Sequence, residues 1–144
     1  MSSEREPDAV AERYARRPVT DRYSVSKPDV WQTLQERQRA LLALFARIGW
    51  DDLASKRLLE VGCGGGANLL ELLRLGFAPE HLAGVELLPE RHAQARHVLP
   101  EAVAVHAGDA LQLDTSLFTV AAGLVRCLDR DLIGHRRRRD SLAC

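Results

Sequence analysis

The stretch LLEVGCGGGANLLELL, residues 58–73, decides the fold of this chain. An apolar run ending at Glu60 passes through a loop of glycines around Cys63 into a leucine-rich segment. Glycine adopts backbone angles that other residues avoid, and it places no side chain between the main chain and a neighbour. The loop therefore predicts a tight turn from a strand to a helix, at which a neighbouring group approaches the backbone closely.

Outward from this loop, strand and helix patterns alternate along the chain. Apolar runs predict strands at 56–62, 81–87 and 102–110, and helical periodicity predicts helices at 67–76 and 89–99. Strand, helix, strand, helix, strand is typical of a parallel sheet with crossover helices. The predicted fold class is therefore α/β, a Rossmann-like doubly wound parallel sheet.

A helical lead-in precedes the first strand. Pro28 suits a helix start and Gly49 a helix end. We expect this helix to cover one face of the sheet rather than to act as a lid, and we expect residues 1–27 to form a polar arm, loose or with one short helix. The apolar residues at helical spacing between the two ends are Val30, Trp31, Leu34, Leu41, Leu42, Phe45 and Ile48.

Composition limits the class of protein and its partners. With 46% hydrophobic and 28% charged residues and no apolar run of membrane-spanning length, we expect a globular, cytoplasmic protein without a membrane partner. Equal numbers of basic and acidic residues give no overall charge to attract nucleic acid. Cys63, Cys127 and Cys144 are too widely spaced for a disulfide framework or a zinc site, so we expect reduced thiols and no metal.

Three acidic residues follow the three predicted strands. Glu60 comes immediately before the glycine loop, Glu86 ends the second strand, and Asp109 ends the third. Ligands of parallel sheets bind outside the carboxyl ends of the strands. A carboxylate at the Glu86 position suits ribose hydroxyls, and one at Asp109 suits an adenine amino group. Each acid alone is typical of a solvated strand end, but three at one edge indicate a nucleoside site.

The segments EVGCGGG, GVELLPERHAQAR and GDA together resemble the cofactor half of class I S-adenosylmethionine (SAM)-dependent methyltransferases, over roughly residues 55–114. The lead-in from residue 21 resembles that of some bacterial members. The resemblance implies that the loop holds the methionine part of SAM, that Glu86 binds the ribose, and that Asp109 and Ala110 bind the adenine. The residues assigned to the cofactor in this way are Glu60, Gly62, Cys63, Gly64, Gly66, Asn68, Glu86, Leu87, Asp109 and Ala110.

Transfer of a methyl group from a sulfonium needs the acceptor held in line and water excluded, with a base only where the acceptor must lose a proton. We expect a small-molecule acceptor, and the sequence identifies no catalytic residue. For Cys63 we expect a packing role rather than a covalent one. For the histidines we expect surface or packing roles, and these are His81, His92, His97 and His106.

A nicotinamide-dependent oxidoreductase is the rival enzyme, since Gly62, Gly64 and Ala67 also satisfy G-x-G-x-x-A with Glu86 at a suitable distance. Glu60 argues against it, because its charge would lie close to a pyrophosphate. The GDA segment also favours a single adenosine.

The pattern changes after Asp114, so we divide the chain into an arm at 1–27, a SAM-binding half-domain at 28–114 and an atypical segment at 115–144. Apolar residues between 117 and 128 have nearly helical spacing, which predicts that the expected fourth strand is missing and the sheet incomplete. A fragment or a changed reading frame is preferred over a sheet completed by another chain. We expect the arginines at 136–139 to form a solvated tail rather than a phosphate-binding patch.

The change of pattern after Asp114 also leaves open an alternative in which the chain is not an enzyme. The chain would then be a SAM-binding remnant or a pseudo-enzyme subunit without an acceptor site of its own. In either case an uncovered sheet edge predicts self-association.

Overall fold

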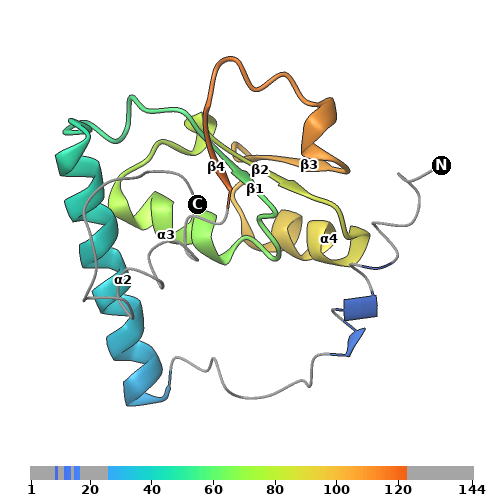
Figure 1. Ribbon diagram of the computed structural model, residues 1–144, viewed down its shortest axis with the longest axis horizontal. Coiled ribbons are helices and arrows are strands. Elements are labelled where there is room, and N and C mark those ends of the chain that lie inside the picture. The colour runs from blue at the N-terminus through green and yellow to red at the C-terminus, as the bar shows by residue number, and fades with distance from the viewer. Residues whose placement is uncertain (1–8, 10–11, 14, 17–25, 123–144) are drawn as a thin grey trace.

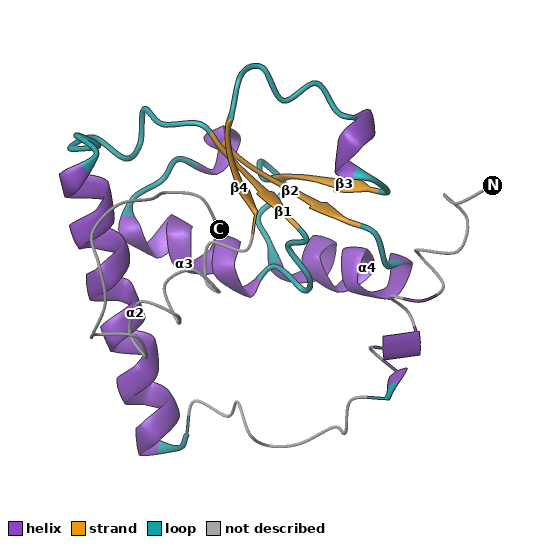
Figure 2. Ribbon diagram, in the orientation of Figure 1, coloured by secondary structure: helices purple, strands orange, loops and turns teal. Residues whose placement is uncertain are grey.

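The computed structural model describes residues 9, 12, 13, 15, 16 and 26–122. Helices and strands alternate along this part of the chain (Figures 1 and 2). In chain order the main elements are α2 (Pro28–Arg47), β1 (Leu58–Val61), α3 (Ala67–Leu75), β2 (Leu82–Glu86), α4 (Pro89–Val98), β3 (Ala104–Ala107) and β4 (Thr119–Ala122). Short 3₁₀ helices, η2 (Pro79–His81) and η3 (Ala110–Gln112), precede β2 and follow β3.

The four strands form one parallel sheet in the order β3-β2-β1-β4. Glu60 at the end of β1 is paired with Gly84 of β2, and Glu86 at the end of β2 is paired with Ala107 of β3. Because all strands run in the same direction, their carboxyl ends meet at one edge. The predicted α/β, Rossmann-like class is confirmed, and the loops after β1, β2 and β3 lie at that shared edge.

The fourth strand departs from the sequence prediction. Thr119–Ala122 pairs in parallel with β1, although its surroundings have nearly helical spacing, so the prediction that no strand follows Asp114 is wrong for these residues. The Thr119 amide donates to the Arg57 carbonyl at 2.9 Å, and the Arg57 guanidinium carbon lies 4.9 Å from the Phe118 ring centroid. An unpaired edge of β1 would leave backbone groups unsatisfied, and this demand outweighs a weak local pattern. Residues 123–144, with the predicted arginine tail, lie outside the described part.

Helices α3 and α4 lie along one face of the sheet, with α2 beside α3 (Figure 2). Leu58, Leu82 and Gly84 share this face, because paired residues of parallel strands project to the same side. Gly84 must stay small: a Cβ there would lie 2.7 Å from the Cys63 sulfur and 2.9 Å from Leu69. The buried apolar cluster on this side contains Leu41, Phe45, Leu58, Cys63, Leu69, Leu72, Phe77, Leu82, Ala95, Leu99 and Val103.

Helix α2 begins and ends close to the predicted residues, and it packs into the core through its carboxyl-terminal half. Leu41 and Phe45 are buried there, and the Phe45 ring lies 5.6 Å from that of Trp50 and 5.4 Å from that of Phe77. That half of α2 therefore packs beside α3 in the buried cluster, which also contains Leu58 and Leu82 of the sheet. Not all of the apolar residues at helical spacing in α2 face the core, because three of them are exposed: Trp31, Leu42 and Ile48.

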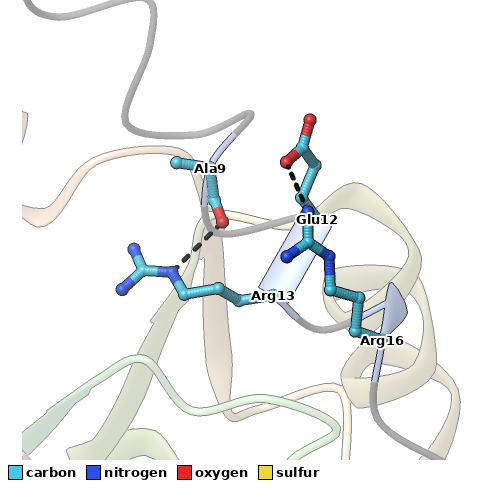
Figure 3. Close-up of polar contacts among 4 residues, drawn as sticks. All are labelled: Ala9, Glu12, Arg13 and Arg16. Carbon is cyan, nitrogen blue, oxygen red and sulfur yellow. Dashed lines mark hydrogen bonds and ion pairs between the residues drawn. The ribbon is translucent and has the colours of Figure 1, made fainter.

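In the predicted polar arm, the described residues are consistent with one short helix. Arg16 N–H donates to the Glu12 carbonyl at 3.2 Å, and the two side chains form an exposed ion pair at 3.4 Å (Figure 3). Arg13 Nε donates to the Ala9 carbonyl one turn earlier. Across the described residues, no helix is long and apolar enough to cross a membrane.

Candidate functional site

The glycine loop folds back over the end of β2. The amides of Gly62 and Cys63 both donate to the Val85 carbonyl, at 2.9 and 3.1 Å. Gly62, Gly64 and Gly66 have φ angles of 73°, 57° and 87°, which other residues rarely adopt. Gly66 then caps the amino end of α3. The loop therefore turns within a few residues and presents bare backbone at the carboxyl edge of the sheet.

Gly62 is the most open point of this loop. It is exposed, and a Cβ built on it would meet no atom within 4 Å. Its neighbour Gly64 is more crowded, with an Arg91 nitrogen 3.1 Å from the position of a Cβ. The free space beside Gly62 is where a ligand can contact the main chain.

Glu86 joins the loop to the end of β2. Its carboxylate is buried, and one oxygen accepts from the Gly64 amide at 2.8 Å while the other accepts from the Leu88 amide at 2.9 Å. Leu87 lies half-buried between the two anchoring points. Each carboxylate oxygen has a second lone pair, so Glu86 can still accept bonds from hydroxyl groups of a ligand.

Glu60 is buried at the end of β1 with only one of its oxygens bonded. Oε1 accepts from the Asn68 side-chain amide at 2.7 Å, whereas Oε2 has no partner among the described residues. Burial raises the pKa of Glu60 to about 7, with Asn68 and Arg37 lowering it and Glu86 raising it. A buried carboxylate oxygen without a partner is costly, and a cationic ligand group would relieve that cost. Together with the space at Gly62, this oxygen shows that the residues present fit a ligand with a positive charge.

Asp109 follows β3 at the same edge. Its side chain accepts from the Leu111 amide at 3.0 Å and so caps η3, of which Ala110 is the first residue. The Gly108 amide donates to the Glu86 carbonyl at 3.0 Å, which attaches this turn to the end of β2. The three predicted acids therefore meet at one edge, but Asp109 is exposed and the two glutamates are buried.

Cys63 lies under the loop rather than in an open cleft. It is buried, and burial, with the nearby charges of Glu60 and Glu86, raises the pKa of its thiol to about 12. A thiol that holds its proton so tightly is a poor nucleophile. The geometry supports the packing role expected for it.

Two of the predicted packing histidines have backbone partners. His81 Nδ1 lies 2.6 Å from the Ala54 carbonyl oxygen, and His92 Nε2 lies 3.0 Å from that of Val105. Within the described residues, no group of three or more histidine, cysteine and acidic residues is arranged to hold a metal.

Sequence reasoning missed a buried ion pair beside the site. Arg37 of α2 and Glu71 of α3 form a salt bridge, and Glu71 is buried. The available signal was Glu71 itself, a charged residue within the leucines of a short core helix. Such a residue needs a partner from another element, but periodicity does not say which.

The comparisons with known proteins agree with this geometry. Residues 33–126 match a family described as a methyltransferase domain. The chain belongs to this family, whose members use SAM. No curated protein matches the sequence.

Three solved structures are similar to parts of the chain. SAM-bound CalS10 of Micromonospora echinaspora, an amino pentose methyltransferase involved in calicheamicin biosynthesis, is 36% identical over 59% of this chain and 36% of its own, with a TM-score of 0.41. A SAM-dependent methyltransferase of Mesorhizobium loti is 20% identical over 68% of this chain and 47% of its own, with a TM-score of 0.47. The PH0226 protein of Pyrococcus horikoshii OT3 is 23% identical over 72% and 44%, with a TM-score of 0.45. The chain thus spans less than half the length of each.

Proposed function

We propose that this chain is the SAM-binding part of a methyltransferase that transfers a methyl group to a small-molecule acceptor. The observation that carries the proposal is the pair of buried glutamates at the carboxyl edge. Glu86 holds the glycine loop by two amide bonds, and Glu60 presents an unpaired buried oxygen beside it. A negative, water-poor site next to bare backbone suits a nucleoside that carries positive charge.

Different residues would bind different parts of the cofactor. In the proposed arrangement the loop at 62–66, with Glu60 and Asn68 beneath it, holds the methionine part. Glu86 and Leu87 hold the ribose, and Asp109 with Ala110 holds the adenine. When bound, SAM supplies a methyl group already activated by its sulfonium. The contribution of the chain is to bind, to orient and to exclude water.

A small-molecule acceptor is the second part of the proposal. Its support is the similarity to CalS10, whose acceptor is an amino pentose, and the zero net charge of the chain, which gives no attraction for nucleic acid. A cytoplasmic location belongs to the same proposal, because Cys63 is a free thiol, as is usual in a reducing compartment.

A SAM-binding unit without turnover is the second candidate. The chain spans 36–47% of the length of the three similar structures, so the activity of a whole methyltransferase is itself part of the proposal. Such a unit would pair its sheet with further strands, and we propose that isolated chains self-associate through a sheet edge. Light scattering at micromolar concentration tests this, and a monodisperse monomer would contradict it.

The experiment that tests the cofactor is calorimetric titration with SAM, S-adenosylhomocysteine (SAH) and NADH, combined with thermal unfolding. We expect SAM and SAH to bind and to raise the unfolding temperature, and NADH to do neither. Glu86→Ala should abolish both effects. Binding of NADH without SAM would overturn the proposal in favour of an oxidoreductase, and SAM binding without release of SAH across a panel of amines and alcohols would favour the second candidate.

A further inference from the structure

A buried polar cluster connects α2 to the predicted cofactor site. Arg37, on α2, has a side chain that is 18% exposed, and its Nη2 bonds Oε2 of Glu71, whose side chain is 6% exposed. Glu71 projects from α3, one turn after Asn68, and Asn68 donates to Glu60. Electrostatic attraction from Arg37 also reaches Glu60. One guanidinium therefore pairs with Glu71 and also favours the ionised form of Glu60.

The cluster is not satisfied within itself. Among the described residues, Arg37 Nε, Glu71 Oε1 and Glu60 Oε2 are buried and have no hydrogen-bond partner. With both glutamates ionised the three side chains carry one net negative charge in a region of low dielectric, which is unfavourable without a further cation. A positive group that joined the cluster would neutralise this charge.

We infer that Arg37 is a positioning residue of the cofactor site, which divides its charge between Glu71 and Glu60 and thereby keeps Glu60 ionised for the ammonium group of the methionine part. This inference rests on the proposed function. It makes the lead-in helix α2 part of the cofactor site, although α2 contributes no residue to the glycine loop.

The groups around Glu60 set the direction of each expected effect. Arg37 from α2 and Asn68 from α3 favour the ionised carboxylate, whereas burial and the charge of Glu86 from β2 oppose it. Cys63 in the loop is neutral at ordinary pH, because its thiol pKa is about 12. On the other side, Glu60 is paired with Ala121 of β4, which has no charge. Glu71 competes with Glu60 for the guanidinium, so removing its charge should release Arg37 toward Glu60.

The test is the pH dependence of SAH affinity between about pH 5.5 and 8.5, measured by calorimetry, with 5′-methylthioadenosine as the control ligand because it lacks the ammonium group. For the wild-type chain we expect SAH affinity to rise with pH through about 7, where Glu60 ionises. Methylthioadenosine affinity should stay level. Glu60→Gln should remove the pH dependence of SAH binding.

Two substitutions should move this midpoint in opposite directions. Arg37→Met should move it to higher pH and weaken SAH binding at pH 7 by about fivefold, because a rise of one pKa unit lowers the ionised fraction of Glu60 from about a half to about a tenth. Glu71→Gln should move it to lower pH, although both changes break the same buried pair and lower stability. A merely structural role would weaken both ligands equally.

Each outcome decides the inference. Midpoints that shift in the same direction, or equal loss of SAH and methylthioadenosine binding, would overturn it. If Arg37→Met does not fold, the Glu71→Gln midpoint alone decides by its direction. Absence of SAH binding to the wild-type chain at every pH would instead show that the proposed function is wrong.

Discussion

The ends of β1 and β2 carry the same residue in two different situations. Glu60 and Glu86 are 4% and 7% exposed, lie on the same side of neighbouring strands, and border the same glycine loop. Both oxygens of Glu86 accept backbone amides, whereas one oxygen of Glu60 has no partner among the described residues. The difference shows that burial alone does not define the role of a carboxylate at a strand end. Its hydrogen bonds decide whether both oxygens hold the loop or one oxygen stays unpaired.

The largest expected effect comes from removing the carboxylate that holds the loop. Glu86→Ala leaves the amides of Gly64 and Leu88 without their acceptor, so we expect about 4 kcal/mol loss of unfolding free energy from two charge-assisted bonds. SAM affinity should fall below detection. Urea unfolding and calorimetry measure the two effects. For the stability effect the matched control is Asp109→Ala, which removes an exposed cap and should cost about 1 kcal/mol.

The second prediction concerns Glu60 and pH. Its folded-state pKa of about 7 lies above the ordinary value of 4.5, so the folded chain binds this proton more tightly than the unfolded one. Its contribution to stability is therefore most favourable below about pH 4.5 and is lost as pH rises to about 7. Glu60→Gln removes that dependence.

Relative to wild type, Glu60→Gln should gain on the order of 3 kcal/mol at pH 8 and show no such gain at pH 4, since each pKa unit corresponds to about 1.4 kcal/mol. Urea unfolding across this pH range measures it. An equal gain in unfolding free energy at pH 4 and pH 8 would show that burial does not raise the pKa of Glu60 in the folded chain.

Two glycine substitutions near these strand ends distinguish a loss of packing from a loss of space for the ligand. Gly84→Ala forces a Cβ against Cys63 and Leu69, and we expect about 2 kcal/mol loss of stability. Gly62→Ala meets no atom but has a φ of 73°, so we expect only about 1 kcal/mol loss. SAH affinity should nevertheless fall more for Gly62→Ala, because its methyl group enters the free space. The reverse order of affinities would move the ligand away from Gly62.

The smallest effect is expected at the thiol beneath both glutamates. In a Cys127→Ser/Cys144→Ser background, Cys63 should resist iodoacetamide at pH 8, because it is buried and its thiol pKa is about 12. Reaction should become rapid in urea. Mass spectrometry of the alkylated chain follows it, and fast labelling of the folded chain would contradict the burial of the loop.

Much of the fold was readable from local patterns. The five predicted strands and helices between 56 and 110 all form, and Gly76 ends α3 with a φ of 116°, as expected of a terminal glycine. The three acids at strand ends were readable for the same reason. In a parallel sheet, residues that end consecutive strands must share an edge whatever their distance in sequence.

Other features depended on contacts between distant segments. Thr119–Ala122 forms a strand by pairing with the edge of β1. Of the apolar residues predicted along α2, only Leu41 and Phe45 are buried. The helix pattern could not reveal either result, since periodicity describes one segment and not its neighbours.

The sequence by itself determined the first three strands, the glycine turn and the presence of a carboxylate at the end of each of these strands, because backbone sterics and hydrophobic period are local properties. Only the tertiary structure decided which carboxylates are buried, which oxygens are bonded, and that Arg37 of α2 acts on Glu60 and Glu71. Those properties arise from desolvation and from charges brought together by folding, and no single segment of the chain contains them.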